Sequence, residues 1–211
     1  MMATTSDLRD VCRLLGGLAL EGAKPDLLRE IQHEGAAAKL GLAMGGRLGE
    51  ALTAMQGALD EEDPDALAAE YTRLMVANAD RGARSPLPVP PWEDCYTGDG
   101  RKVLGPRSQA ALRAYAAAAL GFEGMKEQPA DHVGLELCFV AALLDEEEKG
   151  ARDATTRAAF VNEHLRAFSP ALGRTLTDAA RTTFWREAGR AIALLPGPLS
   201  GELHATDGGR S

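Results

Sequence analysis

The chain has 211 residues, enough for one large domain or two small ones, and its 45% of hydrophobic residues excludes a globally disordered protein. Its formal net charge of -8 disfavours a nucleic-acid-binding protein and favours a cationic partner such as a basic peptide. No apolar run approaches the roughly 18 residues of a membrane span, and the N-terminus lacks a signal-peptide pattern. We therefore expect a cytoplasmic protein without stable membrane insertion.

The first half of the chain carries the start and stop signals of helices. Asp63-Pro64 is the clearest start, because aspartate can cap a helix and proline fits its first turn. Pro25 is placed in the same way, and Gly35 interrupts the pattern that follows it. The predicted helices run from Ser6 or Asp7 to about Leu20, from Pro25 to Gly35, from Ala36 to Leu59, and from Pro64 to about Asn78.

A proline-rich connector of about 25 residues follows, a length that is uncommon for a loop inside a compact domain and often functional. It ends at Gly105 and includes the segment Ser85–Tyr96, which reads SPLPVPPWEDCY. This segment is too rich in proline for regular structure, yet it carries Trp92 and Tyr96. We expect a functional site here.

Helical patterns resume after the connector. Pro106 and Pro129 are placed as first-turn prolines, and Ser169-Pro170 combines a cap with such a proline. The acidic run Glu146–Glu148 is interpreted as a solvated helix end. The predicted helices run from Pro106 to Gly121, from Pro129 to about Lys149, from Asp153 to Phe168, and from Ser169 through the pattern Leu172–Leu195.

These patterns predict the fold class. No convincing strand alternation and no repeat of fixed period are present. We predict a single all-α domain of roughly eight to ten helices over residues 1–199. A division into two lobes near residues 83–91 is left open, and residues 200–211 read as a polar tail.

Two segments of the chain carry side chains that suit peptide capture. Pro91 and Trp92 offer a rigid apolar platform, and Tyr96 adds an amphipathic contact. Asp131 can accept a bidentate arginine, and His132 can donate a hydrogen bond or change charge near neutral pH. Such a groove suits a segment with arginines followed by an apolar stretch.

Three acidic residues lie near this platform in the sequence, and simpler structural roles stay open for Trp92 and Asp131. Glu93, Asp94 and Glu136 would deepen a negative patch around the platform. Trp92 can equally anchor a loop to the core, and Asp131 can be a first-turn acid that stabilises a helix start. The residue types alone do not decide between these roles.

Metal ligation is the second alternative. His132 and Glu136 are four residues apart, on one face of a helix, and Glu163 and His164 can add ligands. The chain lacks the repeated Glu-x-x-His of di-iron bundles, known catalytic motifs, and metal-site spacing of its cysteines. In the bland interpretation His132 caps or bonds locally and Glu136 is solvated. We expect no catalytic residue, no metal and no cofactor; a metal-dependent oxidoreductase using His132, Glu136 and His164 is the enzyme alternative.

Four segments in order resemble the TorD/DmsD/NarJ family of redox-enzyme maturation chaperones. Tyr71–Met75 resembles its aromatic-x-x-Leu-Phe motif, with Met75 in place of Phe. Pro90–Tyr96 resembles its Pro-Pro-aromatic loop, and Gln128–His132 resembles its Glu-Pro-x-Asp-His signature, with Gln in the Glu place. His164–Pro170 resembles its His-Leu-x-x-aromatic-x-Pro segment.

The resemblance implies an all-helical cytoplasmic chaperone that binds the twin-arginine signal peptide, or another N-terminal segment, of a partner molybdoenzyme. Such proteins hold the catalytic subunit until its cofactor is inserted and so delay export. Some members form domain-swapped dimers, so we expect a monomer or such a dimer; a generic helical adaptor stays the bland alternative. The expected peptide-binding residues, six from the resemblance and the last two from the pattern of charge and aromaticity, are Tyr71, Leu74, Pro91, Trp92, Asp131, His132, Tyr96 and Glu136.

Overall fold

The computed structural model describes residues 3–76, 87–97, 104–120 and 128–201. Across these ranges the chain is helical, and its β-structure is limited to an isolated antiparallel bridge between Trp92 and His132. The predicted all-α class is confirmed. None of the helices in these ranges combines the length and apolar character that crossing a membrane requires.

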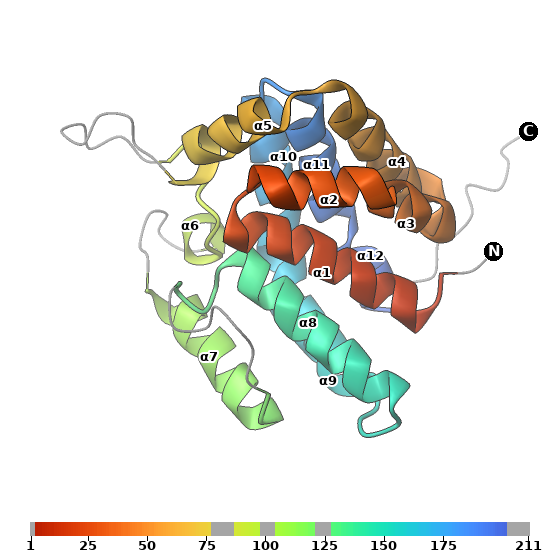
Figure 1. Ribbon diagram of the computed structural model, residues 1–211. Helices are drawn as coiled ribbons and strands as arrows, with labels where there is room; N and C mark the ends of the chain where they lie inside the picture. The colour runs from red at the N-terminus through yellow and green to blue at the C-terminus, as the bar shows by residue number, and fades with distance from the viewer. Residues whose placement is uncertain (1–2, 77–86, 98–103, 121–127, 202–211) are drawn as a thin grey trace, which may run out of the picture.

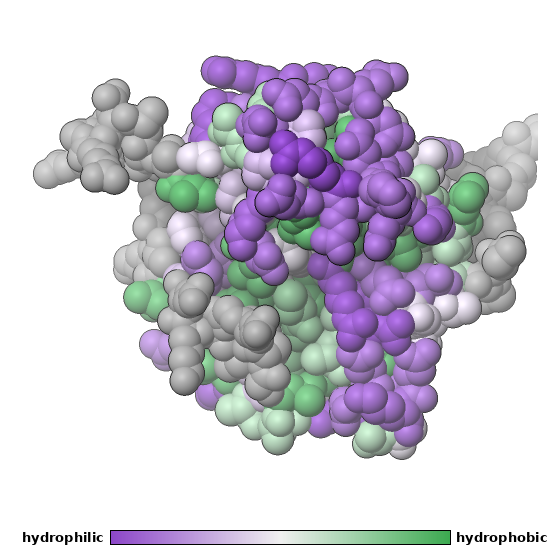
Figure 2. All heavy atoms as spheres, viewed as in Figure 1, coloured by the Kyte–Doolittle hydropathy of each residue, from purple (hydrophilic) through white to green (hydrophobic). Residues whose placement is uncertain are grey.

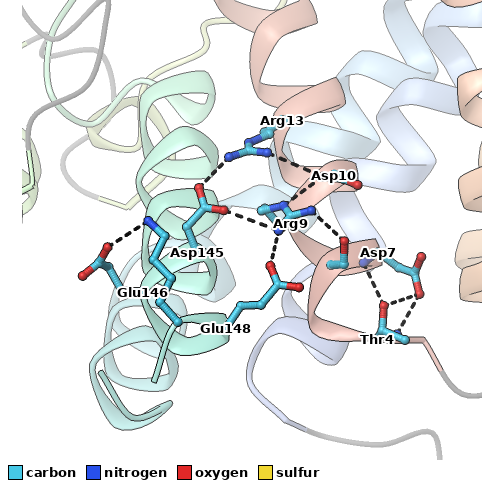
Figure 3. Close-up of polar contacts among 10 residues, drawn as sticks. Thr4, Asp7, Arg9, Asp10, Arg13, Asp145, Glu146 and Glu148 are labelled. Atoms are coloured by element: carbon cyan, nitrogen blue, oxygen red, sulfur yellow. Dashed lines mark hydrogen bonds and ion pairs between the residues drawn. The ribbon is translucent and has the colours of Figure 1, made fainter. Parts of the chain in front are cut away.

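The N-terminal part follows the predicted order with two local differences. Thr4, rather than Ser6 or Asp7, caps the first helix, because its side chain accepts from the Asp7 amide while the Asp7 carboxylate accepts from the Thr4 amide (Figure 3). The helix predicted over residues 36–59 is divided at Gly45, whose φ of 61° interrupts it. The elements are α1 (Thr5–Glu21), α2 (Pro25–Glu34), α3 (Ala36–Met44), α4 (Gly46–Glu61), α5 (Pro64–Tyr71) and the π-helical turn η1 (Thr72–Val76).

The C-terminal part differs more from the prediction, and the described residues form more helices than expected. Pro129 does not start a helix; α8 starts four residues later, with His132 as its N-cap. The break predicted at Ser169 lies at His164, whose backbone (φ -108°, ψ -80°) is not helical, and Pro170 lies inside α10. The elements are α6 (Asp94–Thr97), α7 (Pro106–Ala118), α8 (Val133–Glu148), α9 (Thr155–Glu163), α10 (Leu165–Ala179), α11 (Thr183–Leu194) and α12 (Pro196–Leu199).

Some predicted helix ends do not match the structure or fall outside the described ranges. Ala119, not Gly121, caps α7, and it does so in the left-handed conformation. Gly121 and Asn78 both lie outside the described residues, as does most of the predicted polar tail.

Helix pairs that cross at glycine build the scaffold. α1 packs along α8, α3 along α4, and α10 along α11, while α11 also packs on α4 (Figure 1). A methyl group on either glycine of a crossing would meet atoms of the opposite helix at 3.2 Å or less, a tight or overlapping contact. The crossing pairs are Gly16 with Gly134, Gly41 with Gly49, and Gly173 with Gly189.

Helix α8 is the centre of the site described below. It is apolar around most of its circumference, which is typical of a helix enclosed by the rest of a domain. Figure 2 shows a hydrophilic band where its C-terminal part meets the start of α1, and a hydrophobic surface beside its N-terminal part, toward α7. The two ends of α8 therefore differ in character.

Candidate functional site

A short extended segment, Val89–Glu93, holds the site together; we call it the strap. At one end, the Val89 amide donates to the Leu74 carbonyl at 3.0 Å, which ties the strap to η1. At the other, the Val133 amide donates to Pro91 at 2.8 Å, and the Glu93 amide donates to Asp131 at 2.9 Å. Backbone bonds thus join three of the segments that the sequence analysis singled out, although the connector was expected to lack regular structure.

Asp131 organises the chain on the far side of the strap. Its Oδ2 accepts from the Asp94 amide at 3.0 Å, and the Asp94 carboxylate in turn accepts from the amides of Arg107 and Ser108 at the start of α7. The Asp131 side chain is fully buried, and burial raises its pKa. Asp131 precedes the N-cap of α8, so the first-turn alternative is wrong.

His132 has a structural task at the start of α8. Its Nδ1 accepts from the Gly134 amide at 3.1 Å, and its ring makes a T-shaped contact with Trp92 at a centroid distance of 6.3 Å. The side chain is 3% exposed, and burial lowers its pKa to about 4. The local-capping alternative is therefore confirmed, and the pKa lies below the near-neutral range that the sequence suggested.

Glu93, Glu136 and His164 meet in the interior; we call them the Glu–His cluster. His164 Nδ1 lies 2.7 Å from Glu93 Oε2 and 3.9 Å from Glu136 Oε1, and all three side chains are 2% exposed or less. The ring of Phe160 stacks on that of His164 at 4.6 Å. The alternative in which Glu136 is solvated is wrong.

The electrostatics of this cluster are unbalanced. Burial raises the pKa of Glu136 well above its usual range, and the charges of Glu93 and Asp131 raise it further, while Arg107 opposes them. If Glu136 is ionised, no donor among the described residues reaches either of its oxygens. The guanidinium of Arg107 lies 3.5 Å from Glu93 Oε1, beyond good hydrogen-bonding distance.

The aromatic part of the predicted site is half-buried. Trp92 Nε1 is buried without a hydrogen-bond partner among the described residues. Tyr96 packs its ring 6.1 Å from Phe168. Of the eight predicted peptide-binding residues, only Trp92 and Tyr96 are more than slightly accessible.

Tyr71 and Leu74 belong to a different part of the core. The Tyr71 hydroxyl donates to Ala19 at 2.9 Å and its ring lies 5.6 Å from Trp185, whereas Leu74 is fully buried. The Leu74 carbonyl joins η1 to the strap by accepting from the Val89 amide. The structure therefore separates these two residues from the Glu–His cluster.

Sequence reasoning missed two features of the site. Glu93 was treated as one of several acids near an aromatic platform, although it is the partner of His164. No sequence pattern pointed to Arg107, because only the tertiary fold brings the start of α7 to the strap. His164 had a signal, since it opens the fourth motif.

A separate groove lies away from these residues. A groove of about 530 Å³ is lined by residues of α4, α10 and α11, such as Arg47, Asp178 and Glu187, and by none of the predicted peptide-binding residues. Its lining mixes both signs of charge, and Glu187 is already paired with Arg190 at 2.8 Å. Volume alone does not make this groove the functional site.

Comparison with known proteins identifies a family. A family model described as the nitrate reductase delta subunit matches residues 43–173, a range that contains the strap, α8 and His164. No curated protein matches the chain at a significant level.

Proposed function

The chain belongs to the nitrate reductase delta subunit family, a family of molybdoenzyme maturation chaperones, and from that membership we propose how it recognises its client. The ligand is the N-terminal twin-arginine segment of the catalytic subunit of a molybdopterin-dependent oxidoreductase. Binding occurs in the cytoplasm and delays export until the cofactor is inserted. The chain acts as a binding protein without catalytic activity.

One observation carries the proposal. Trp92 is half-buried and directly precedes Glu93, a buried acid that lies beside Glu136, whose oxygens lack a donor among the described residues. Trp92 precedes Glu93 on the strap and contacts His132, and its indole N–H has no partner among the described residues. A tryptophan whose ring is partly exposed is typical of a binding anchor. The buried carboxyls behind it favour a cationic ligand, in keeping with the net charge of -8.

The apolar part of such a segment needs an apolar surface. The hydrophobic surface beside the N-terminal part of α8, toward α7, supports this requirement (Figure 2). Leu112 of α7 is 52% exposed. We therefore propose that the arginines are drawn to the acidic side and that the apolar stretch follows α7 and α8.

Calorimetry with a synthetic peptide tests the proposal. A peptide with paired arginines and an apolar segment should bind, and its arginine-to-glutamine analogue should bind more weakly at low salt. Salt should weaken the first interaction without abolishing it, because only the charged part is screened. Equal affinity for both peptides at low salt would contradict the charge argument.

Trp92→Ala tests the anchor. Its peptide affinity should fall by about 2 kcal/mol, as expected for an aromatic hot spot. Leu42→Ala is the control, because Leu42 is 80% exposed on α3, away from the strap. If Trp92→Ala unfolds instead of losing affinity, Trp92 is a core residue and the assignment is wrong.

Asp131→Asn tests the acidic side better than alanine does. Asparagine retains an acceptor for the Asp94 amide, so the start of α6 stays capped while the charge is removed. If arginine bonds this carboxylate, affinity should fall by about 1.5–3 kcal/mol for the arginine peptide and little for its glutamine analogue. An equal loss for both peptides would assign Asp131 to the scaffold.

The assembly state belongs to the same proposal. We propose that residues 1–199 act as one domain and that the protein is a monomer or a dimer exchanging elements across the connector. Sedimentation across a range of concentrations distinguishes the two.

A further inference from the structure

The Glu–His cluster has the composition of a metal site. One ligand atom each from Glu93, Glu136 and His164 lies within 4.8 Å of the others, and all three residues are buried. We propose that this cluster binds one divalent transition-metal ion, with two carboxylates and one imidazole as its protein ligands. This inference does not depend on peptide binding.

Three separate parts of the chain supply the ligands, and the backbone of each part fixes the position of its ligand. Glu93 ends the strap, which is bonded to Asp131. Glu136 lies in the first turn of α8. His164 occupies the non-helical break between α9 and α10, and its Nδ1 faces both carboxyls. A bound ion would therefore join the strap, α8 and this break at one point.

The charge of the cluster gives the second, independent reason. Glu136 is completely buried and, once ionised, both of its oxygens lack a donor among the described residues. A buried carboxylate must be paired with a cation, coordinate a metal or take up a proton. Arg107 does not meet this need, because it approaches the opposite oxygen of Glu93 and its side chain is 36% exposed. One divalent ion would neutralise the two carboxylates of the cluster.

The ligand types narrow the choice of metal. Imidazole nitrogen suits zinc, iron and related ions, and carboxylate oxygen suits manganese as well, so Zn²⁺, Fe²⁺ and Mn²⁺ fit the mixed set better than Ca²⁺ or Mg²⁺. Ligand atoms about 2.1 Å from an ion lie at most about 4.2 Å apart. The observed limit of 4.8 Å thus requires only small side-chain movements. The stacked ring of Phe160 already restrains the imidazole.

The ligand set differs from the one considered for the sequence. His132, whose Nδ1 caps α8, is not a member of the cluster, and Glu93 is a member that the sequence did not suggest. Because Trp92 directly precedes Glu93, a bound ion would fix the strap that carries the proposed peptide anchor. The site is thus a candidate structural centre.

Metal titration of chelator-treated, tag-free protein is the test, with Zn²⁺, Mn²⁺ and Fe²⁺ added separately, iron under anaerobic conditions. The wild type should bind about one ion per chain, and the ion should raise its melting temperature. Glu136→Gln, which imitates the protonated side chain without its charge, should weaken binding by at least the roughly 10–100-fold that changes near a metal site cost. Glu187→Gln is the matched control, since Glu187 is also buried but lies on α11 and pairs with Arg190.

Other results of this titration also decide whether the Glu–His cluster binds a metal ion. If the wild type binds none of the three ions, or if Glu136→Gln and His164→Asn both bind like the wild type, the proposal is wrong. Should the variants fail to fold, Co²⁺ absorption of the wild type reads the ligands directly. A spectrum without thiolate charge transfer supports the cluster, whereas a thiolate band assigns the ion to a cysteine and overturns it. Peptide calorimetry on the metal-free protein keeps failure of this site distinct from failure of the proposed function.

Discussion

The two ends of α8 both carry charge, but they handle it in opposite ways. At the C-terminal end, Asp145 and Glu148 face Arg9 and Arg13 across the contact with α1 (Figure 3). These side chains are partly or largely exposed, and each carboxylate has a guanidinium. Such pairs contribute little to stability, since water solvates the separated charges almost as well.

At the N-terminal end the acidic groups are buried, and among the described residues both oxygens of Glu136 lack a hydrogen-bond partner. Asp131 and Glu136 are fully buried, and the guanidinium of Arg107 approaches the oxygen of Glu93 that does not face His164. Leaving carboxyls in this state costs folding free energy. The two ends of α8 therefore differ in how their charges are compensated, and the proposed peptide and metal sites both lie at the N-terminal end.

The largest expected effect is a loss of folding stability at acidic pH that originates at the N-terminal end of α8. The pKa of His132 falls from 6.5 to about 4 on folding, so the unfolded chain takes up a proton below pH 6.5 that the folded chain refuses. Stability therefore decreases as the pH falls from 6.5 to 4. At about 1.4 kcal/mol per pKa unit, His132 should account for a loss of about 3 kcal/mol.

His132→Asn isolates this effect in denaturant unfolding measured at several pH values. The asparagine oxygen can replace Nδ1 as the acceptor for the Gly134 amide, so the cap survives without the titration. Asp131 and Glu136, whose pKa values are raised by burial, act in the opposite direction, but they do so in both proteins. The wild type should lose stability relative to the variant below pH 6.5; a constant difference would refute the prediction.

A methyl group at Gly134 should disturb the N-terminal end next most strongly. An alanine Cβ there would lie 2.5 Å from Leu20 Cγ and 2.8 Å from the Gly16 carbonyl. Gly134→Ala should destabilise the fold by about 1–3 kcal/mol, because the backbone of α1 cannot yield easily. In α1 itself, Gly17 has open space around it, so Gly17→Ala should stabilise by up to about 1 kcal/mol. Thermal melting of the pair checks both signs, and equal effects would show that the crossing tolerates a side chain.

Local signals in the sequence predicted much of the scaffold. Pro25, Pro64 and Pro106 start helices as expected, because a first-turn proline acts through its own backbone geometry. The same rule wrongly predicted helix starts at Pro129 and Pro170. The start of α8 is set by the strap pairing with residues 131–133, and α10 starts early because the chain turns at His164.

The sequence predicted that some of these residues lie close together, but it did not predict the geometry in which they meet. Motif order identified Trp92, Asp131 and His132 as a group, and the strap brings these three residues together. Burial was not predictable, since an acid near a helix start is usually solvated. The pairing of Glu93 with His164, 71 residues apart, depends on long-range packing that no local pattern encodes.

The smallest effect is expected at the C-terminal end of α8. Arg13 is 53% exposed and its partner Asp145 is 26% exposed, so Arg13→Gln should cost no more than about 1 kcal/mol. The cost should shrink further in 1 M salt, where the screening length is only about 3 Å. Arg9 is 16% exposed and faces both Asp145 and Glu148, so Arg9→Gln should cost somewhat more and respond less to salt. Denaturant unfolding of the two variants at low and high salt measures these differences. A loss well above 1 kcal/mol for Arg13→Gln would mean that this end is more than a solvated packing contact, and the contrast between the two ends of α8 would then need another explanation.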